Sequence, residues 1–258
     1  MNISLKKEII WLIGGTSESV AIAQLLTEHN FPYIITVTTP SASKLYQKIK
    51  NSQIFVGKLS DREIYQLMAQ HYINTVIDAT HPFAVNISQE VINICRDLAI
   101  KYIRYERLSL SIPENNLITY VSCFNYLVVD NSPLKNKRVL LTIGAKFLPL
   151  FTNYHHQATL YTRILPYGDS LHQAYQSGFE CDRIIALRPP INYALEKALW
   201  QMWDIEIVVT KAGGKAGGED IKYQVAKELN IPLIVIQRPK LEYPIVINTL
   251  DKILEMII

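Results

Sequence analysis

The residues with the clearest capacity for chemistry follow a short apolar run. Val76-Ile77 leads directly into Asp78-Ala79-Thr80-His81-Pro82-Phe83-Ala84, so an acid, a hydroxyl and an imidazole come after hydrophobic residues. This pattern is typical of a buried parallel strand whose carboxyl end opens on a crevice. We therefore expect Asp78, Thr80 and His81 to line a binding crevice, with a structural role as the alternative for an isolated histidine.

A glycine-rich segment is the second candidate. Val209-Thr210-Lys211-Ala212-Gly213-Gly214-Lys215-Ala216-Gly217-Gly218-Glu219 places glycines and two lysines between a predicted strand and a predicted helix. The backbone of such a loop can approach an anionic ligand closely, and the lysines add positive charge. The spacing does not match a Walker P-loop, which disfavours nucleotide triphosphate hydrolysis. We interpret the segment as a mobile ligand-binding loop, and the alternative is a flexible surface linker.

Glycines also follow the first predicted strand. Gly14-Gly15-Thr16 stands where dinucleotide-binding folds hold a phosphate at a helix N-terminus. The segment is not a G-x-G-x-x-G motif, and Glu18 adds negative charge to the first helical turn. A ligand role is therefore weighed against a plain turn in which Thr16 or Ser17 caps the helix.

The loop after the second predicted strand bears on the choice of cofactor. It contains Thr39, Ser41, Ser43 and Lys44 but no acid. Because NAD-binding folds usually place an acid there for the ribose hydroxyls, hydroxyls and a lysine favour the 2′-phosphate of NADPH. A solvated loop with a helix cap is the alternative.

Three arginines follow other predicted strands. Arg104 and Arg107 could bind carboxylates bidentately, with an internal pair to Glu106 as the alternative. Arg188 precedes Pro189-Pro190 at the end of a strand in the second half.

Alternating strands and helices position these residues. Strands are expected at residues 8–13, 33–38, 53–56, 75–77, 102–104, 138–143, 159–163, 183–187, 206–210 and 232–236. Helices are expected at residues 16–29, 62–71, 86–99, 169–176, 192–202, 219–230 and 248–256. The rhythm predicts an α/β fold class with two Rossmann-like parallel-sheet domains and a cleft between them. Polar residues near 130–136 place the domains at 1–132 and 133–258.

Composition narrows the class of protein. The chain has 258 residues, 49% hydrophobic and 19% charged, which suits a globular protein with a sizeable core. The formal net charge of +3 comes from scattered lysines and arginines, which disfavours nucleic acid as a partner. No apolar run approaches the roughly 20 residues of a membrane span. The three cysteines lie far apart in the sequence, which indicates neither a disulfide framework nor a metal site and favours a cytoplasmic protein. The sequence does not indicate the oligomeric state.

Taken together, the motifs resemble the precorrin-6A reductase family of cobalamin biosynthesis, which includes the cobalt-precorrin-6A reductases. The resemblance spans almost the whole chain. It is carried by Gly14-Gly15-Thr16-x-Glu18, Gly57-Lys58-Leu59, Asp78 to Ala84, Arg104-x-Glu106-Arg107, Val209-Thr210-Lys211-x-x-Gly214-x-x-Gly217 and Arg238-Pro239. The chain departs from the family pattern after Lys211, where Ala212 and Gly213 stand, at Arg188-Pro189-Pro190, and at residues 39–44.

The resemblance implies that NADPH and a tetrapyrrole substrate are held between the domains, and that hydride transfer reduces one double bond of precorrin-6A or cobalt-precorrin-6A. The expected catalytic residues are His81, Thr80 and Lys211. The expected cofactor-binding residues are Gly14, Gly15, Thr16, Ser43, Lys44, Lys211, Gly213, Gly214 and Gly217. The expected substrate-binding residues are Asp78, Phe83, Arg104, Arg107 and Arg188. The alternatives are another NADP-dependent reductase of a smaller substrate and a non-catalytic dinucleotide-sensing protein.

Overall fold

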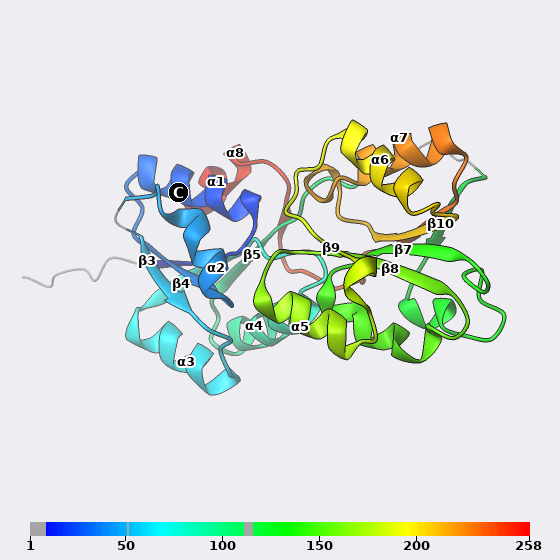
Figure 1. The fold of residues 1–258 in the computed structure, drawn as a ribbon. Helices are drawn as coiled ribbons and strands as arrows, with labels where there is room; N and C mark the ends of the chain where they lie inside the picture. The colour runs from blue at the N-terminus through cyan, green and yellow to red at the C-terminus, as the bar shows by residue number, and fades with distance from the viewer. Residues whose placement is uncertain (1–8, 51, 111–115) are drawn as a thin grey trace, which may run out of the picture. The chain divides into compact units, whose positions relative to one another are not determined.

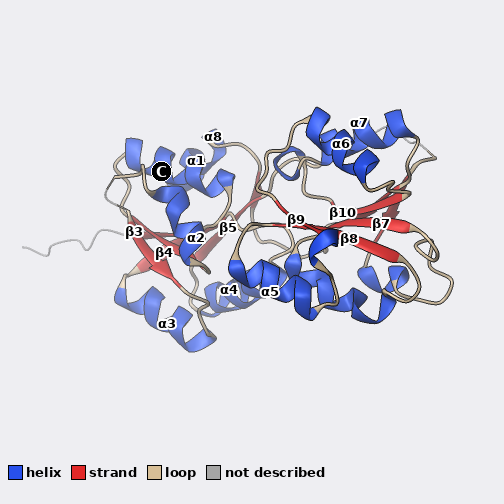
Figure 2. Ribbon diagram, in the orientation of Figure 1, coloured by secondary structure: helices blue, strands red, loops and turns tan. Residues whose placement is uncertain are grey.

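The computed structural model describes residues 9–50, 52–110 and 116–258 (Figure 1). The chain forms two compact units, one made of residues 1–108 and 239–258 and the other of residues 109–238. In each unit a sheet is covered by helices on both faces (Figure 2). In the described part of the chain, no helix is both long and apolar enough to cross a membrane.

The sheet of the first unit has six parallel strands in the order β12-β5-β4-β1-β2-β3. Their bounds are β1 (Ile9–Ile13), β2 (Tyr33–Val37), β3 (Gln53–Val56), β4 (Ile73–Asp78), β5 (Lys101–Tyr105) and β12 (Val246–Ile247). The helices are α1 (Ser17–Glu28), α2 (Pro40–Ser43), α3 (Asp61–Gln70), α4 (Val85–Asp97) and α8 (Asp251–Ile257), with a 3-10 turn at Lys44–Tyr46. The strand order reverses between β1 and β4, and the carboxyl ends of strands at such a reversal form the usual binding crevice.

Strand β1 explains why this sheet is buried on both faces. Leu12 packs in one apolar cluster with Ile22 of α1, whereas its neighbour Trp11 packs in another with Ile64 of α3. Trp11 and Leu12 are both fully buried, because successive side chains of a strand point to opposite faces. The Trp11 indole N–H donates to the Thr36 hydroxyl at 2.9 Å, which satisfies its one polar atom.

The sheet of the second unit also has six parallel strands, in the order β6-β11-β10-β7-β8-β9. Their bounds are β6 (Ile118–Val121), β7 (Arg138–Thr142), β8 (Thr159–Ile164), β9 (Ile184–Ala186), β10 (Ile207–Lys211) and β11 (Leu233–Ile236). The helices are α5 (Gly168–Gln176), α6 (Tyr193–Met202) and α7 (Glu219–Leu229). 3-10 segments lie at Phe124–Leu127, Ala145–Tyr154, Cys181–Arg183 and Lys215–Gly217. Here the reversal lies between β7 and β10.

These sheets confirm the predicted α/β class with two parallel-sheet domains; residue 8, the predicted start of the first strand, lies outside the described residues. The predicted boundary at 132 and 133 does not coincide with the two units. The reason is that β6 pairs with β11 of the second sheet, while β12, near the C-terminus, returns to pair with β5 of the first. The predicted cleft concerns the relative placement of the domains and stays a prediction.

Candidate functional site

Most of the predicted site residues lie at the strand-order reversals of the two sheets or beside them. In the first unit they lie at or after the ends of β1, β2, β4 and β5, and in the second at the end of β10 and in the loop after it, with Arg188 after β9. Each group is described within its own unit.

Asp78, the last residue of β4, is the centre of the first group. The carboxylate is fully buried, and its Oδ1 accepts from the Thr80 N–H at 2.9 Å and from Arg104 Nη1 at 2.9 Å. Oδ2 accepts from the Ser88 hydroxyl at 2.6 Å and from the Tyr102 hydroxyl. Burial and the neighbouring Asp78 charge raise the pKa of Tyr102, so this phenol remains a donor. Asp78 is thus saturated by internal donors.

Arg104 completes this cluster from β5. The side chain is 1% exposed, and Nη1 also donates to the Thr80 hydroxyl at 3.0 Å. Nε donates to Glu106 at 2.8 Å, and the guanidinium carbon lies 5.2 Å from the centre of the Tyr243 ring. This geometry favours the internal alternative over the predicted contact of Asp78 and Arg104 with substrate, because both charges are already neutralised inside the unit.

The turn after Asp78 presents the predicted catalytic pair. Thr80 is 8% exposed, and His81 is partly buried. The Phe83 N–H donates to His81 Nδ1 at 3.2 Å, and the two rings lie 5.8 Å apart. Because Nδ1 is an acceptor, the neutral imidazole carries its proton on Nε2. Thr80 shares a small pocket with Pro82, Glu18, Arg104 and Arg107, so the structure brings Thr80 together with two of the predicted arginines.

The turn after β1 is tightly packed. A Cβ on Gly14 would lie 2.2 Å from the Tyr46 hydroxyl oxygen, so only glycine fits. The Gly15 N–H donates to that hydroxyl at 2.8 Å, and the Thr16 N–H donates to the Ser19 hydroxyl at 3.0 Å. The reciprocal bond from the Ser19 N–H to Thr16 Oγ1 makes a capping box at 3.1 Å. The capping alternative for Thr16 is therefore confirmed.

These bonds bear on the predicted phosphate site at the start of α1. The N–H groups of Gly15 and Thr16 already have internal acceptors, and the Thr16 hydroxyl donates to the Ala79 carbonyl at 2.7 Å. The Glu18 carboxylate adds negative charge there and pairs with Arg107 at 2.9 Å. The turn consequently fits hydroxyl or amide groups better than a diphosphate.

The loop after β2 lies beside this turn. A Cβ on Gly15 would lie 4.0 Å from the Ala42 Cβ. Thr39 caps α2 by accepting from the Ala42 N–H at 3.2 Å, and the Ser43 hydroxyl donates to the Pro40 carbonyl at 2.8 Å. Lys44 is exposed. The predicted cap is present, and the Ser43 hydroxyl has an internal acceptor, whereas Lys44 is exposed.

Lys211, at the end of β10, is the principal cation of the second group. Its Nζ lies 4.9 Å from the centre of the Phe147 ring and would lie 3.7 Å from a Cβ on Gly144. Burial, together with the positive charge of Lys146, lowers the pKa of Lys211 to about 8. An anion placed beside this ammonium would be attracted strongly, because it would offset both effects. The sequence motifs did not include Phe147 or Lys146 as neighbours of Lys211.

The glycine-rich loop after Lys211 is held by several hydrogen bonds. Arg238 Nε donates to the Ala212 carbonyl at 2.9 Å, and the Gly214 N–H donates to Glu219 at 2.8 Å. Lys222 Nζ donates to the Gly217 carbonyl at 2.7 Å. Lys222 is a supporting residue that the sequence motifs did not include, because it stands inside an ordinary amphipathic helix, and Glu219 ends the glycine-rich motif without a role having been predicted for it. Gly213, Gly214 and Gly217, which were predicted to bind cofactor, form the backbone of this held loop.

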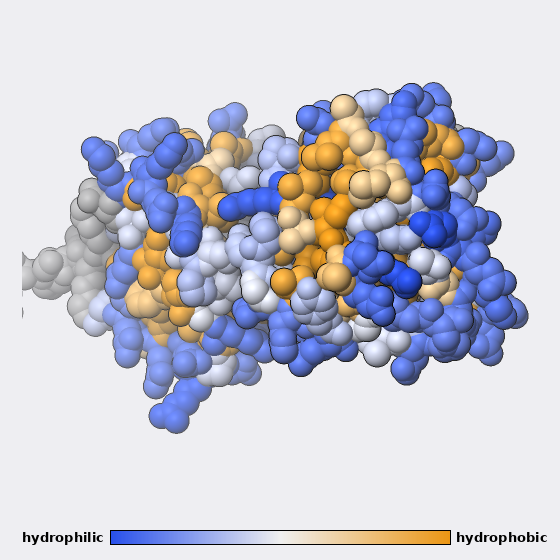
Figure 3. Space-filling model, in the orientation of Figure 1, coloured by the Kyte–Doolittle hydropathy of each residue, from blue (hydrophilic) through white to orange (hydrophobic). Residues whose placement is uncertain are grey.

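Arg188 lies apart from these contacts, directly after β9. The residue is exposed, and the peptide bond between Pro189 and Pro190 is cis. Figure 3 shows a hydrophobic patch on the drawn face over β9 and the start of α6. Leu165 and Leu195, which are 42% and 41% exposed, are large apolar side chains in this part of the chain. Arg188 therefore offers a cation at the surface of the second unit.

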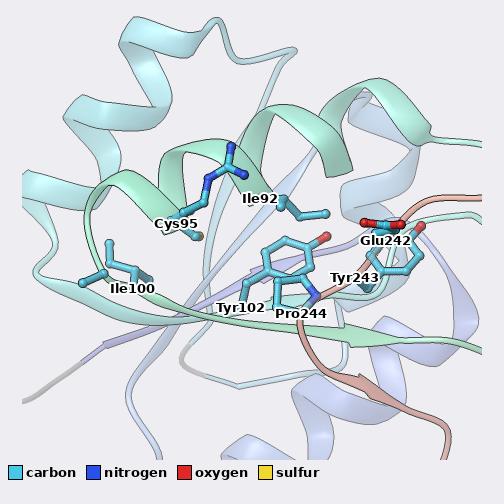
Figure 4. Close-up of a pocket in the computed structure, with 9 residues that line it drawn as sticks. Ile92, Cys95, Ile100, Tyr102, Glu242, Tyr243 and Pro244 are labelled. Atoms are coloured by element: carbon cyan, nitrogen blue, oxygen red, sulfur yellow. The ribbon is translucent and has the colours of Figure 1, made fainter.

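A larger pocket has none of the predicted residues in its lining, although its Tyr102 and Tyr243 contact Asp78 and Arg104. It has a volume of about 550 Å³ and is formed by the end of α4, Tyr102 and the returning segment at Glu242, Tyr243 and Pro244 (Figure 4). The lining includes Ala99 and Ile100, which precede β5, so it opens toward the amino end of that strand. Ligands of parallel sheets bind at the opposite ends. Within the described residues, no group of three or more potential ligands could hold a metal ion.

Comparison with known proteins identifies the family. The family model described as precorrin-6x reductase CbiJ/CobK matches residues 9–257. The chain is 44% identical to the cobalt-precorrin-6A reductase of Synechocystis sp., over 90% of this chain and 88% of the relative. It is 31% identical to the cobalt-precorrin-6A reductase of Priestia megaterium, over 97% and 98%. The solved structure of CobK precorrin-6A reductase has the same fold, with a TM-score of 0.78 at 22% identity over 96% and 95% of the two chains.

The resemblance inferred from the motifs is therefore confirmed. The matched segment includes both strand-order reversals and every residue named in the two groups, so no part of the candidate site lies outside the shared region. The chain belongs to the precorrin-6x reductase family and is an oxidoreductase.

Proposed function

We propose that the protein is an NADPH-dependent reductase of cobalt-precorrin-6A. The observation that carries the proposal is the 44% identity to a protein of that name across 90% of this chain. A nicotinamide cofactor supplies the hydride that reduces one double bond of the macrocycle. The protein's own contribution is to bind the two ligands, to orient them and to exclude water.

The loop after β2 supports NADPH over NADH. Thr38, Thr39 and Lys44 are exposed there, and no acid follows β2 to bind a free ribose diol. Lys44 is the residue we assign to a 2′-phosphate, with the loop held beside the Gly15 turn by α2. Gly14, Gly15 and Thr16 form the turn after β1, and we propose that this turn binds the hydroxyl and amide groups of the cofactor.

Lys211 and the glycine-rich loop are assigned to an anionic group. The ammonium is partly desolvated, and the backbone of Gly213, Gly214 and Gly217 permits close approach. Two sources of negative charge fit this site, a cofactor phosphate and a carboxylate of the substrate, because a precorrin carries acetate and propionate side chains. Arg107 and Arg188 are the further cations we assign to those carboxylates.

Thr80 and His81 are assigned to the reacting region. With Nδ1 accepting from the Phe83 N–H, we assign to the Nε2–H of His81 the donation of a hydrogen bond or a proton to the substrate. Phe83 packs against the imidazole and keeps its ring in this orientation. Asp78 and Arg104 act from inside the unit, because they fix the Thr80 backbone and hydroxyl. The free cysteines and the need for NADPH fit a cytoplasmic enzyme.

One assay tests substrate and cofactor together. Loss of reduced-nucleotide absorbance is measured with NADPH or NADH, on cobalt-precorrin-6A and on the metal-free form. We expect the fastest turnover with NADPH and the cobalt form. Tight NADPH binding without oxidation in either case would instead indicate a dinucleotide-sensing protein. Turnover of a smaller acceptor but of neither precorrin would indicate a different reductase.

Variants test the assigned residues. Lys211→Ala is expected to raise the Michaelis constant of whichever ligand carries the anion, NADPH or precorrin, by about tenfold or more. Lys135→Ala, which removes an exposed lysine of the same unit, is the control. Unchanged constants for both ligands would reject the role of Lys211. Full turnover of His81→Gln at every pH would reject His81 as the proton donor.

A further inference from the structure

The side chain of Lys222 lies beneath the glycine-rich loop and does not reach solvent. Lys222 is on the second turn of α7 and is 2% exposed. Its Nζ donates to the Gly217 carbonyl at 2.7 Å and to the Gly218 carbonyl at 3.2 Å. Within the described part of the chain, both of its hydrogen-bond acceptors are thus backbone atoms at the end of the loop. Burial of an ammonium group costs several kcal/mol, so this placement needs a reason other than stability.

Glu219 holds the other end of the same loop. The residue is 4% exposed, and its Oε2 accepts from the Gly214 N–H at 2.8 Å. The Glu219 N–H in turn donates to the Gly214 carbonyl at 3.3 Å. Gly214 and Gly218 both have positive φ angles, of 67° and 65°, so these fixed points are bends that other residues adopt with strain.

The charges around Lys222 keep its ammonium oriented toward the loop. Its pKa is lowered to about 8, because burial and Arg163 of β8 lower it more than Glu196 of α6, Glu219 and Asp220 raise it. Glu196 is itself engaged, because it accepts from Arg163 and from the Trp200 indole N–H at 3.0 Å. With Glu196 turned to these partners, the Lys222 ammonium donates instead to the two loop carbonyls.

We propose that Lys222 and Glu219 are positioning residues that hold the loop from Ala212 to Gly218 in the conformation that receives the anionic group beside Lys211. The loop's backbone is otherwise unusually free, because four of its seven residues are glycine. Fixing it before binding removes an entropy cost that would otherwise weaken the complex. This inference rests on the proposed function of the loop as an anion site.

The main test separates loop order from overall stability. Lys222→Met removes both hydrogen bonds but keeps the buried volume, and replacing a buried charge by an apolar group is often neutral for stability. We expect faster amide hydrogen exchange in the loop peptide without ligand, an increase of about tenfold or more in the NADPH dissociation constant, and a melting temperature close to that of the unaltered protein. Lys227→Met, on the exposed face of the same helix, should change none of these.

Glu219 supplies a graded second test. Glu219→Gln keeps an oxygen acceptor for the Gly214 N–H, whereas Glu219→Ala does not, so the alanine variant should show the larger rise in loop exchange and in the dissociation constant. Unchanged loop exchange in Lys222→Met would overturn the proposal. A rise spread over α7 and β10, together with a fall in melting temperature, would also overturn it, because the role would then be structural. Failure of the unaltered protein to bind NADPH would refute the assigned cofactor, and the exchange measurements would still decide the positioning role.

Discussion

Removal of the Asp78 charge should destabilise the first unit strongly. In Asp78→Asn, the Arg104 guanidinium, which is 1% exposed, would keep only Glu106 as a charged partner. Removing one partner of a buried ion pair lowers the free energy of unfolding by about 3–5 kcal/mol. Because Glu106 remains as a partner of Arg104, we expect a loss of about 3 kcal/mol. The Ser88 and Tyr102 hydroxyls now donate to the carboxylate. In the variant, the amide N–H groups would face these donors.

Urea denaturation measures this loss. With a slope of about 2 kcal/mol per molar urea, a loss of about 3 kcal/mol lowers the midpoint by about 1.5 M. Hydrogen exchange on peptides of β4 shows whether the affected transition belongs to the first unit. Asp97→Asn, which alters an exposed carboxylate on α4 of the same unit, should stay within about 0.5 kcal/mol.

A double variant tests the cause. Asp78→Asn combined with Arg104→Met removes the uncompensated charge and should regain part of the loss, because the cost arises from an unpaired buried cation. If Asp78→Asn alone lowered the stability by less than about 1 kcal/mol, the ion pair would not be the organising contact of this turn.

Two further predictions concern Lys211 and Gly14. The pKa of Lys211 is lowered from 10.5 to about 8, so its ammonium form opposes folding fully below about pH 8, and this penalty fades as the pH rises toward 10.5. The Lys211→Met variant should therefore be more stable than the unaltered protein at neutral pH, and the two stabilities, measured by urea titration, should converge as the pH rises toward 10.5. A constant difference at every pH would contradict the lowered pKa of Lys211. Gly14→Ala places a methyl group 2.2 Å from the Tyr46 hydroxyl oxygen and should cost about 1–3 kcal/mol, as measured by thermal unfolding. Tyr46→Phe in the same chain should restore part of it, and a Gly14→Ala protein as stable as the unaltered one would show that the turn can relax.

The main strands and helices were predictable because they carry strong local signals. The fully buried strands read as continuous apolar runs, as in Val76-Ile77 of β4. Strands β6 and β12 carry no such signal, since they are four and two residues long and partly exposed. Their places in the sheets depend on pairing with β11 and β5, which a local pattern does not report. The misplaced domain boundary follows from these two strands.

The site was predictable at the ends of strands and much less so in its supporting residues. Asp78 and Lys211 stand where apolar runs stop, and the structure places both at strand-order reversals. Tyr46 and Lys222, by contrast, are ordinary residues of a 3-10 turn and a helix in sequence. Their importance arises from contacts with Gly14 and Gly217 that only the folded chain creates. Arg104 shows a different limit, because its sequence position does not reveal that its guanidinium is buried and paired with Asp78 and Glu106.

The two strand-order reversals differ in electrostatics, and this difference determines which ligand groups we expect each of them to bind. At the first, Asp78 pairs with Arg104 and Glu18 pairs with Arg107, so little net charge faces a ligand. At the second, Lys211 is partly desolvated beside Lys146, and a fixed glycine loop adjoins it. An anion gains most where a cation is poorly solvated. We therefore expect the anionic group beside Lys211 to be the most strongly held, while the first unit supplies the exposed Lys44, Arg107 in its pair with Glu18, and neutral donors such as the Nε2–H of His81.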